Sequence, residues 1–195
     1  MREDAVGAAF PSPLKTSTPH SLLSGGRRAY LRRMIDDLYS GRILALAANM
    51  PRVGRLETPF PAFGWPGTGE QVAKLCGSTA TVDVMLDLWA TTITDYAQEV
   101  KACALGQAAA AALGRDIVGA SVAEVRQARA EMIDMLKNGG EGPTGRFEGL
   151  RDLKPVAAYP ARHASTLVAL DAVVKAIEAA SEEWEPPCIL ATEGA

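Results

Sequence analysis

The feature that most constrains this chain is a strand-to-helix junction within residues 95–114, DYAQEVKACALGQAAAAALG. A strand pattern runs to about Val100, and an alanine-rich helix begins at Cys103. This junction sets a thiol beside exposed backbone N–H groups and the positive end of a helix dipole, and both favour a thiolate. Lys101 adds positive charge two residues earlier. Cys103 is therefore either a nucleophile or soft-metal ligand, or an inert buried side chain, since free cysteines are often buried.

Composition limits the function classes that remain. The chain has 195 residues, of which 48% are hydrophobic, enough for one domain with a core. The net charge of −3 and the pI near 5.5 argue against nucleic-acid binding. No apolar run approaches the roughly 20 residues that span a bilayer, and no secretory signal is visible, so we expect no membrane association. Three widely spaced cysteines predict no disulfide framework and favour a reducing, cytoplasmic setting.

The pattern divides the chain into three parts. Residues 1–33 are rich in proline, serine, glycine and arginine without a period, which predicts a disordered basic tail. A transit peptide, and sequence upstream of a natural start at Met34, are the alternatives for this segment. Residues 34–180 carry the patterns of a folded domain. Residues 181–195, with two adjacent prolines, are predicted to form a flexible C-terminal tail.

The folded part predicts an α+β domain, in which a three-stranded antiparallel sheet packs against about five helices. Strands are predicted where polar and apolar residues alternate between short connections, at residues 70–76, 79–88 and 91–100. Helices are predicted from apolar spacing of three and four at residues 35–49, 103–113, 121–137, 147–153 and 161–180. Residues 51–69, with four prolines and the aromatic residues Phe60, Phe63 and Trp65, are predicted to form a loop.

Three side chains at the ends of these elements are candidates for chemistry. Cys76 ends a strand at a tight turn, Cys103 begins a helix, and His163 begins the last helix on its apolar stripe. Two thiolates and an imidazole suit zinc, iron or an iron–sulfur cluster. Only the fold can bring such widely spaced residues together. The alternative for each of the three is a side chain that packs in the core and has no chemical role. A nucleophilic pair of Cys103 and His163, as in a thiol-dependent transferase or hydrolase, is an alternative.

Four acidic side chains alternate along the predicted strands. They are Asp83, Asp87, Asp95 and Glu99. This alternation predicts a solvated face of the sheet.

Short motifs occur along the chain in a recognisable order. They are Leu38-Tyr39-Ser40, Asn49-Met50-Pro51-Arg52-Val53-Gly54, Cys76-Gly77, Lys101-Ala102-Cys103-Ala104-Leu105 and Arg162-His163-Ala164-Ser165-Thr166-Leu167. From about Leu38 to Glu178 the chain resembles the NifU/IscU-type iron–sulfur cluster scaffold family, including its SUF-associated branch. The motifs are similar to that family's first helix, its N-P-R-x-x-G turn and its three cysteine segments.

The resemblance implies a scaffold role, not an enzymatic one. In the family, a cysteine desulfurase delivers sulfur to a scaffold cysteine, iron joins it, and the transient cluster passes to a recipient apoprotein. Some members hold zinc in the same pocket, and some act chiefly as sulfur acceptors. Carried over to this chain, the resemblance makes Cys76, Cys103 and His163 the ligands of a cluster or of zinc. Auxiliary roles then fall to Lys101, Ser78 and Cys188.

The chain departs from the family pattern at ligand positions. Ser78 stands at the aspartate of the C-G-D motif, and Ala164 stands at the third cysteine. A fourth ligand would then come from water, a substrate sulfur, Cys188 or a second chain, the last of which would make a homodimer. A degenerate member that binds a desulfurase or an assembly partner without ligating anything is the alternative.

Overall fold

Three strands form one antiparallel sheet. They are β1 (Trp65–Ala73), β2 (Ser78–Leu86) and β3 (Ile93–Lys101), hydrogen-bonded in that order. The structure is a computed structural model that describes residues 38–57 and 64–183, all within a unit that begins at Asp36. The predicted α+β class and the three-stranded antiparallel sheet are confirmed.

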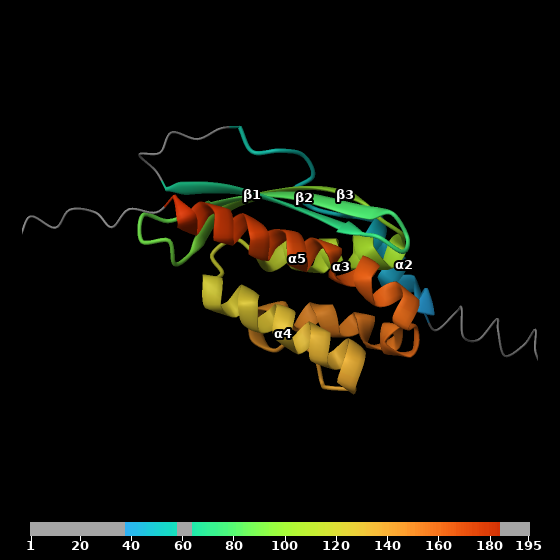
Figure 1. The fold of residues 1–195 in the computed structure, drawn as a ribbon. Coiled ribbons are helices and arrows are strands. Elements are labelled where there is room, and N and C mark those ends of the chain that lie inside the picture. The colour runs from blue at the N-terminus through green and yellow to red at the C-terminus, as the bar shows by residue number, and fades with distance from the viewer. Residues whose placement is uncertain (1–37, 58–63, 184–195) are drawn as a thin grey trace, which may run out of the picture. The chain divides into compact units, whose positions relative to one another are not determined.

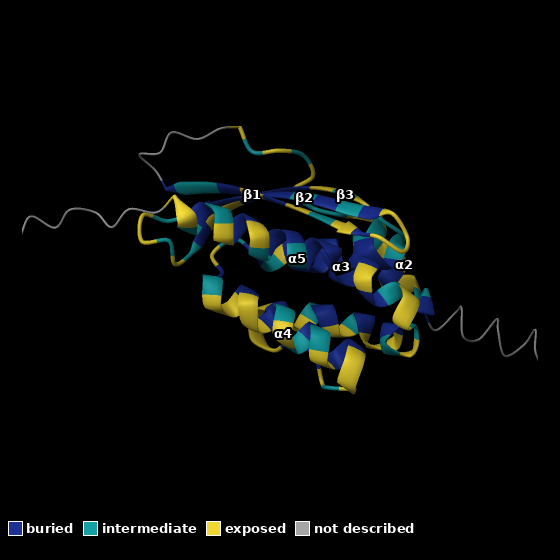
Figure 2. Cartoon of the chain, in the orientation of Figure 1, coloured by how far each residue is buried: buried dark blue, intermediate teal, exposed yellow. Residues whose placement is uncertain are grey.

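Five helices accompany the sheet within the described ranges. They are α2 (Gly41–Ala48), α3 (Ala104–Asp116), α4 (Val122–Asn138), the 3-10 helix η2 (Gly145–Ala158) and α5 (Pro160–Glu182). Figure 1 shows α3 and α5 against one face of the sheet, with α4 and η2 beyond these two helices. The sides of α3 and α5 between these layers are buried (Figure 2). Within the described part of the chain, no helix is long and apolar enough to cross a membrane.

Local signals placed the boundaries of α4 correctly. The Ser121 hydroxyl accepts a hydrogen bond from the Glu124 backbone N–H at 3.1 Å, and a Glu124 carboxylate oxygen accepts one from the Ser121 N–H at 2.7 Å. This is the predicted capping box, which satisfies N–H groups that the first turn leaves unpaired. Gly139 ends the helix in the left-handed conformation, with φ of 79°.

The loop prediction for residues 51–69 was wrong from Trp65 onward, where β1 begins. Glycine and proline usually indicate a loop, but here they suit a strand at the edge of the sheet. A Cβ on Gly67 would collide with the carbonyl oxygen of Ala176, and a Cβ on Gly69 would collide with that of Ala172. The two glycines therefore let α5 approach the backbone of β1.

Some predictions fall outside the described residues. These include the boundary of the predicted N-terminal tail, the start of the first predicted helix, and the loop positions Phe60 and Phe63. The boundary of the predicted C-terminal tail, at residue 181, lies among the described residues, and there α5 continues to Glu182. The first predicted helix is interrupted at Tyr39 and Ser40, and α2 begins at Gly41. The N-terminal boundary stays a prediction.

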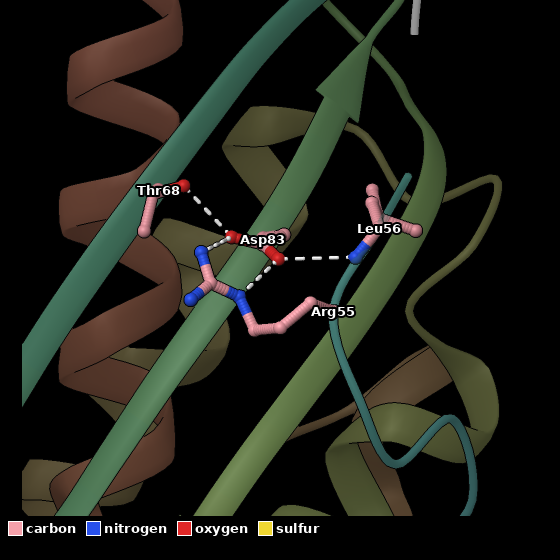
Figure 3. Close-up of polar contacts among 4 residues, drawn as sticks. All are labelled: Arg55, Leu56, Thr68 and Asp83. Carbon is pink, nitrogen blue, oxygen red and sulfur yellow. Dashed lines mark hydrogen bonds and ion pairs between the residues drawn. The ribbon is translucent and has the colours of Figure 1, made fainter. Parts of the chain in front are cut away.

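Residues 52–57 cross from the edge of β3 to the face of the sheet opposite the helices. The N–H of Gln98 donates to the Arg52 carbonyl at 2.9 Å, and the N–H of Gly54 donates to the Gln98 carbonyl at 3.0 Å. Beyond this bridge, Arg55 and Leu56 reach the side chain of Asp83 in β2, as Figure 3 shows. The segment is therefore attached both to the sheet edge and to its outer face.

Asp83 is not on a solvated face as predicted, because only 6% of it is exposed. Its carboxylate accepts hydrogen bonds from Arg55 Nε at 2.6 Å and Nη2 at 2.8 Å, from Thr68 Oγ1 at 2.7 Å and from the Leu56 N–H at 3.1 Å (Figure 3). Burial raises the pKa of Asp83, but these hydrogen bonds outweigh it and the net pKa is lowered. Asp95 and Glu99 on β3 are exposed as predicted.

Replacing Asp83 with asparagine should lower the free energy of unfolding by about 2 kcal/mol at neutral pH, because it removes hydrogen bonds to a buried charge. A lowered folded pKa means that the contribution of Asp83 is complete above the unfolded pKa of about 3.9 and is lost as the pH falls through the folded pKa. The difference between wild type and D83N should therefore shrink in acid. Urea unfolding at neutral and acidic pH measures it.

The control for this prediction is E99Q, which neutralises an exposed carboxylate on the same face of the sheet. We expect E99Q to change stability by less than about 0.5 kcal/mol. Equal effects of the two variants would contradict a special role for Asp83.

Candidate functional site

Cys76 lies in the turn that joins β1 to β2. Its backbone N–H and that of Gly77 both donate to the Ala73 carbonyl, at 3.2 and 2.9 Å. Gly77 has φ of 68°, a conformation that glycine adopts without strain. The turn leaves the Cys76 side chain exposed, with its Sγ 3.1 Å from the Ser78 hydroxyl. The tight turn is where the sequence predicts it, but Cys76 lies within the turn and not at the end of the strand, which stops at Ala73.

Cys103 lies immediately before α3, at the junction that the sequence predicts. Its backbone is extended, with φ of −66° and ψ of 168°, and its carbonyl accepts a hydrogen bond from the Gln107 N–H at 3.0 Å. The side chain is half-buried. Its Sγ lies 3.2 Å from the hydroxyl of Ser165 in α5.

A chain of hydrogen bonds links the two cysteines through two serines. The hydroxyls of Ser78 and Ser165 are 3.0 Å apart, so the order is Cys76, Ser78, Ser165, Cys103. Both serines are buried, with 4% and 0% of their surface exposed. We call these four residues the thiol–hydroxyl chain. It connects a turn, the start of β2, α5 and the residue before α3.

Close packing of α3 on α5 holds Ser165 in place. A Cβ on Gly106 would lie 2.7 Å from the Ser165 carbonyl oxygen and 3.1 Å from its Oγ. Only glycine at position 106 leaves room for this approach. The small residues that follow Cys103 therefore serve to bring α5 to the site.

His163 is not joined to the cysteines by any hydrogen bond of the described residues. Its Nε2 lies 3.2 Å from the Ala157 carbonyl oxygen, and the side chain is buried. Successive residues of an α-helix are about 100° apart, so Ser165 lies about 200° around α5 from His163. The assignment of His163 as a ligand stays a prediction, and the structure provides no hydrogen-bonded Cys103–His163 pair.

Sequence reasoning missed Ser165, because it took Ala164 as the counterpart of the third family cysteine. Ala164 is exposed, whereas Ser165 faces the thiols. The available signal was the serine two positions after His163, just before the apolar run that begins at Leu167. Ser78, predicted as auxiliary, lies in the thiol–hydroxyl chain. Cys188 lies outside the described residues.

The thiol–hydroxyl chain opens into a hollow of about 450 Å³. Its lining residues are Cys76, Gly77, Ser78, Val100, Lys101, Ala102, Cys103, Gln107 and Arg162. Of these described residues, two carry positive charge and none carries a carboxylate. The hollow therefore favours anionic sulfur species.

Hydrogen bonds from the Ser78 hydroxyl and backbone lower the pKa of the Cys76 thiol. Burial raises the pKa, but by less than either Ser78 contribution lowers it, and Ser165 and the positive charge of Arg162 lower it slightly further. A larger fraction of Cys76 is therefore thiolate at neutral pH than in an ordinary cysteine.

Replacing Ser78 with alanine should raise the pKa of Cys76, because it removes the largest cause of the lowered value. The alkylation rate of Cys76 as a function of pH should then shift to higher pH, toward the ordinary thiol value of about 8.5. Peptide mass spectrometry after iodoacetamide treatment separates Cys76 from the other cysteines. S181A, which alters a distant serine of α5, should leave the profile unchanged, and an unshifted profile for S78A would contradict this prediction.

The described residues do not complete a metal site. Among them, no group of three or more histidine, cysteine or acidic side chains could hold a metal ion. Structural zinc has four protein ligands of these types, and iron–sulfur clusters are held mainly by four cysteine thiolates. The thiol–hydroxyl chain offers two thiols and two hydroxyls, which do not fit a closed site of either kind.

Comparison with known proteins places this geometry in a family. No protein-family model and no curated protein match the chain. The solved N-terminal domain of a NifU-like nitrogen-fixing protein from Brucella abortus is 45% identical, with a TM-score of 0.71, covering 77% of this chain and 99% of that domain. A putative SUF-system iron–sulfur cluster assembly scaffold from Fervidobacterium islandicum shares the fold at 21% identity and a TM-score of 0.62, covering 73% and 98%. The chain therefore belongs to the NifU/IscU-like scaffold family.

Proposed function

We propose that this chain acts in iron–sulfur cluster assembly as a sulfur acceptor, with Cys76 as the first acceptor. The observation that carries the proposal is the exposed Cys76 thiol, hydrogen-bonded to Ser78 at the lip of a positively charged hollow. Membership of the family supports the assembly role. A sulfur acceptor must be open to its donor, and Cys76 is the more exposed thiol of the thiol–hydroxyl chain.

The chemistry is a thiol–persulfide exchange. The Cys76 thiolate attacks the terminal sulfur of a donor persulfide, the S–S bond of the donor breaks, and a new S–S bond forms on Cys76. The donor leaves as a thiolate and the proton stays on the transferred sulfur, so no oxidant or reductant is consumed. Once the transferred sulfur has released its proton to solvent, Lys101 and Arg162 would attract the resulting anionic persulfide. The donor class is a cysteine desulfurase, and the recipient is the next protein in cluster assembly.

An iron–sulfur cluster, as cargo, would need further ligands. Cys76 and Cys103 would supply two thiolates, and a donor, a recipient or a second copy of the chain would supply the others. This part of the proposal predicts that any bound cluster is transient, because half of its ligands leave with the partner.

The test is to incubate the full chain with a cysteine desulfurase and cysteine, and then to measure its intact mass. We expect the addition of one sulfur atom, located on the peptide that contains Cys76 and removed by a thiol reductant. The same mixture without cysteine is the control. No added sulfur would contradict the proposal, and retained desulfurase binding in that case would favour the non-ligating interaction module.

A further inference from the structure

We propose that Ser78 and Ser165 make this site a metal-independent cradle for a cysteine persulfide, in which hydroxyl donors take the place of metal ligands. The inference rests on the proposed sulfur-acceptor function. It assigns Ser165 to the site together with Cys76, Ser78 and Cys103. It concerns how sulfur is held after transfer.

Each of the two hydroxyls lies against one of the two thiols. Ser78 Oγ lies 3.1 Å from Cys76 Sγ, and Ser165 Oγ lies 3.2 Å from Cys103 Sγ. These are hydrogen-bond contacts to sulfur. A serine hydroxyl is not among the usual ligands of structural zinc or of iron–sulfur clusters.

The two hydroxyls can both direct their protons toward the Cys76 thiolate. Each hydroxyl has one proton to donate and two lone pairs to accept with. Ser165 is fully buried, so its proton goes either to Cys103 or to Ser78. When Ser165 donates to Ser78 and Ser78 donates to Cys76, both hydroxyls direct their protons toward negative charge on the Cys76 side. The Cys103 S–H then donates to Ser165, and every link of the thiol–hydroxyl chain carries one proton.

The charged side chains around the hollow also select its occupant. Of the described residues that line the hollow, Lys101 and Arg162 are the charged ones, and both are positive. A site built to bind a divalent cation usually places carboxylates or several thiolates around it. Positive side chains disfavour a free metal cation and favour an anionic persulfide. The hydroxyl groups and the positive side chains therefore both favour an anionic persulfide over a metal ion.

The experiment loads wild type, S78A, S165A and the double variant with sulfur from a desulfurase, in the presence and absence of a metal chelator. Each variant is first checked for native folding by circular dichroism and thermal unfolding. We expect wild type to load equally with and without the chelator. The persulfide should decay at least about tenfold faster in the double variant, since hydrogen bonds to charged groups are the strong ones. Equal decay in wild type and the double variant, or loading that the chelator abolishes, would overturn the inference.

Two further variants test the assignment of Ser165 without any sulfur. S78D/S165C should bind one zinc ion per chain, measured by elemental analysis and by competition with a chromophoric chelator, because it supplies a carboxylate and three thiols at one place. S78D/A164C is the matched control and should not bind zinc, because position 164 is exposed and is not among the residues that line the hollow. Zinc binding by the control alone would overturn the assignment of Ser165. Failure of wild type to accept sulfur under any condition would instead reject the proposed function.

Discussion

Replacing Cys76 with alanine is expected to abolish sulfur uptake by this chain. Cys76 is the exposed thiol of the site, and its hydrogen bond from Ser78 lowers its pKa and so increases the thiolate that attacks the donor. Cys103 is half-buried, whereas Cys76 is exposed, so a bulky donor protein reaches Cys103 less easily. The measurement is the intact mass after incubation with a cysteine desulfurase and cysteine, at pH 7 and limiting time. C76A should show no added sulfur atom.

C103A is the matched comparison, because it removes a thiol at the other end of the thiol–hydroxyl chain. We expect C103A to accept sulfur on Cys76 and to differ from wild type mainly in how long the persulfide persists. The reverse pattern, with uptake lost in C103A and kept in C76A, would make Cys103 the entry thiol. Circular dichroism of both variants should match wild type, since neither side chain is fully buried.

Replacing Gly69 with alanine is expected to lower the free energy of unfolding of this chain strongly, because an added methyl group has no room there. Gly69 lies in β1 beneath α5, where an added Cβ would collide with the carbonyl oxygen of Ala172 and the backbone nitrogen of Ala176. Helix backbone cannot move aside as a flexible side chain can. We expect the free energy of unfolding to fall by about 3 kcal/mol. Urea unfolding monitored by circular dichroism measures this change.

G41A is the control, because nothing lies within 4 Å of a Cβ added at Gly41 in the first turn of α2. Alanine favours a helix over glycine, so stability should stay the same or rise by up to about 1 kcal/mol. A loss in G69A no greater than about 0.5 kcal/mol would show that α5 does not pack closely on β1.

Local signals predicted much of the fold. The capping box of Ser121 and Glu124, the alternation along residues 79–86 and the alanine-rich run after Cys103 each predicted an element that the structure contains. Such patterns work because caps, period-two strands and amphipathic helices depend on residues close together in sequence. The family resemblance, confirmed by the Brucella abortus relative, rested on short motifs of the same local kind.

Where local propensity and tertiary contact disagreed, prediction failed. Gly67 and Gly69 indicated a loop, yet they lie in a strand. They are glycines because α5 packs so closely on this strand that no side chain fits between them. Asp83 indicated a solvated face, yet Arg55, far away in sequence, crosses the sheet and buries it. In both cases a partner element, absent from the local pattern, decided the outcome.

In the functional site too, local sequence patterns predict some features and tertiary contacts decide the others. By itself, the sequence determined that a tight turn lies at Cys76 and Gly77 and that Cys103 begins a helix, because both features are set by neighbouring residues. Only the tertiary structure decided that Ser165 contacts the Cys103 thiol and the Ser78 hydroxyl, whereas His163 lies against the Ala157 carbonyl oxygen. A helix presents a different side at each residue, and the side of α5 that faces the site is chosen by its close packing against Gly106 of α3. That packing is a contact between distant segments, which no local pattern specifies.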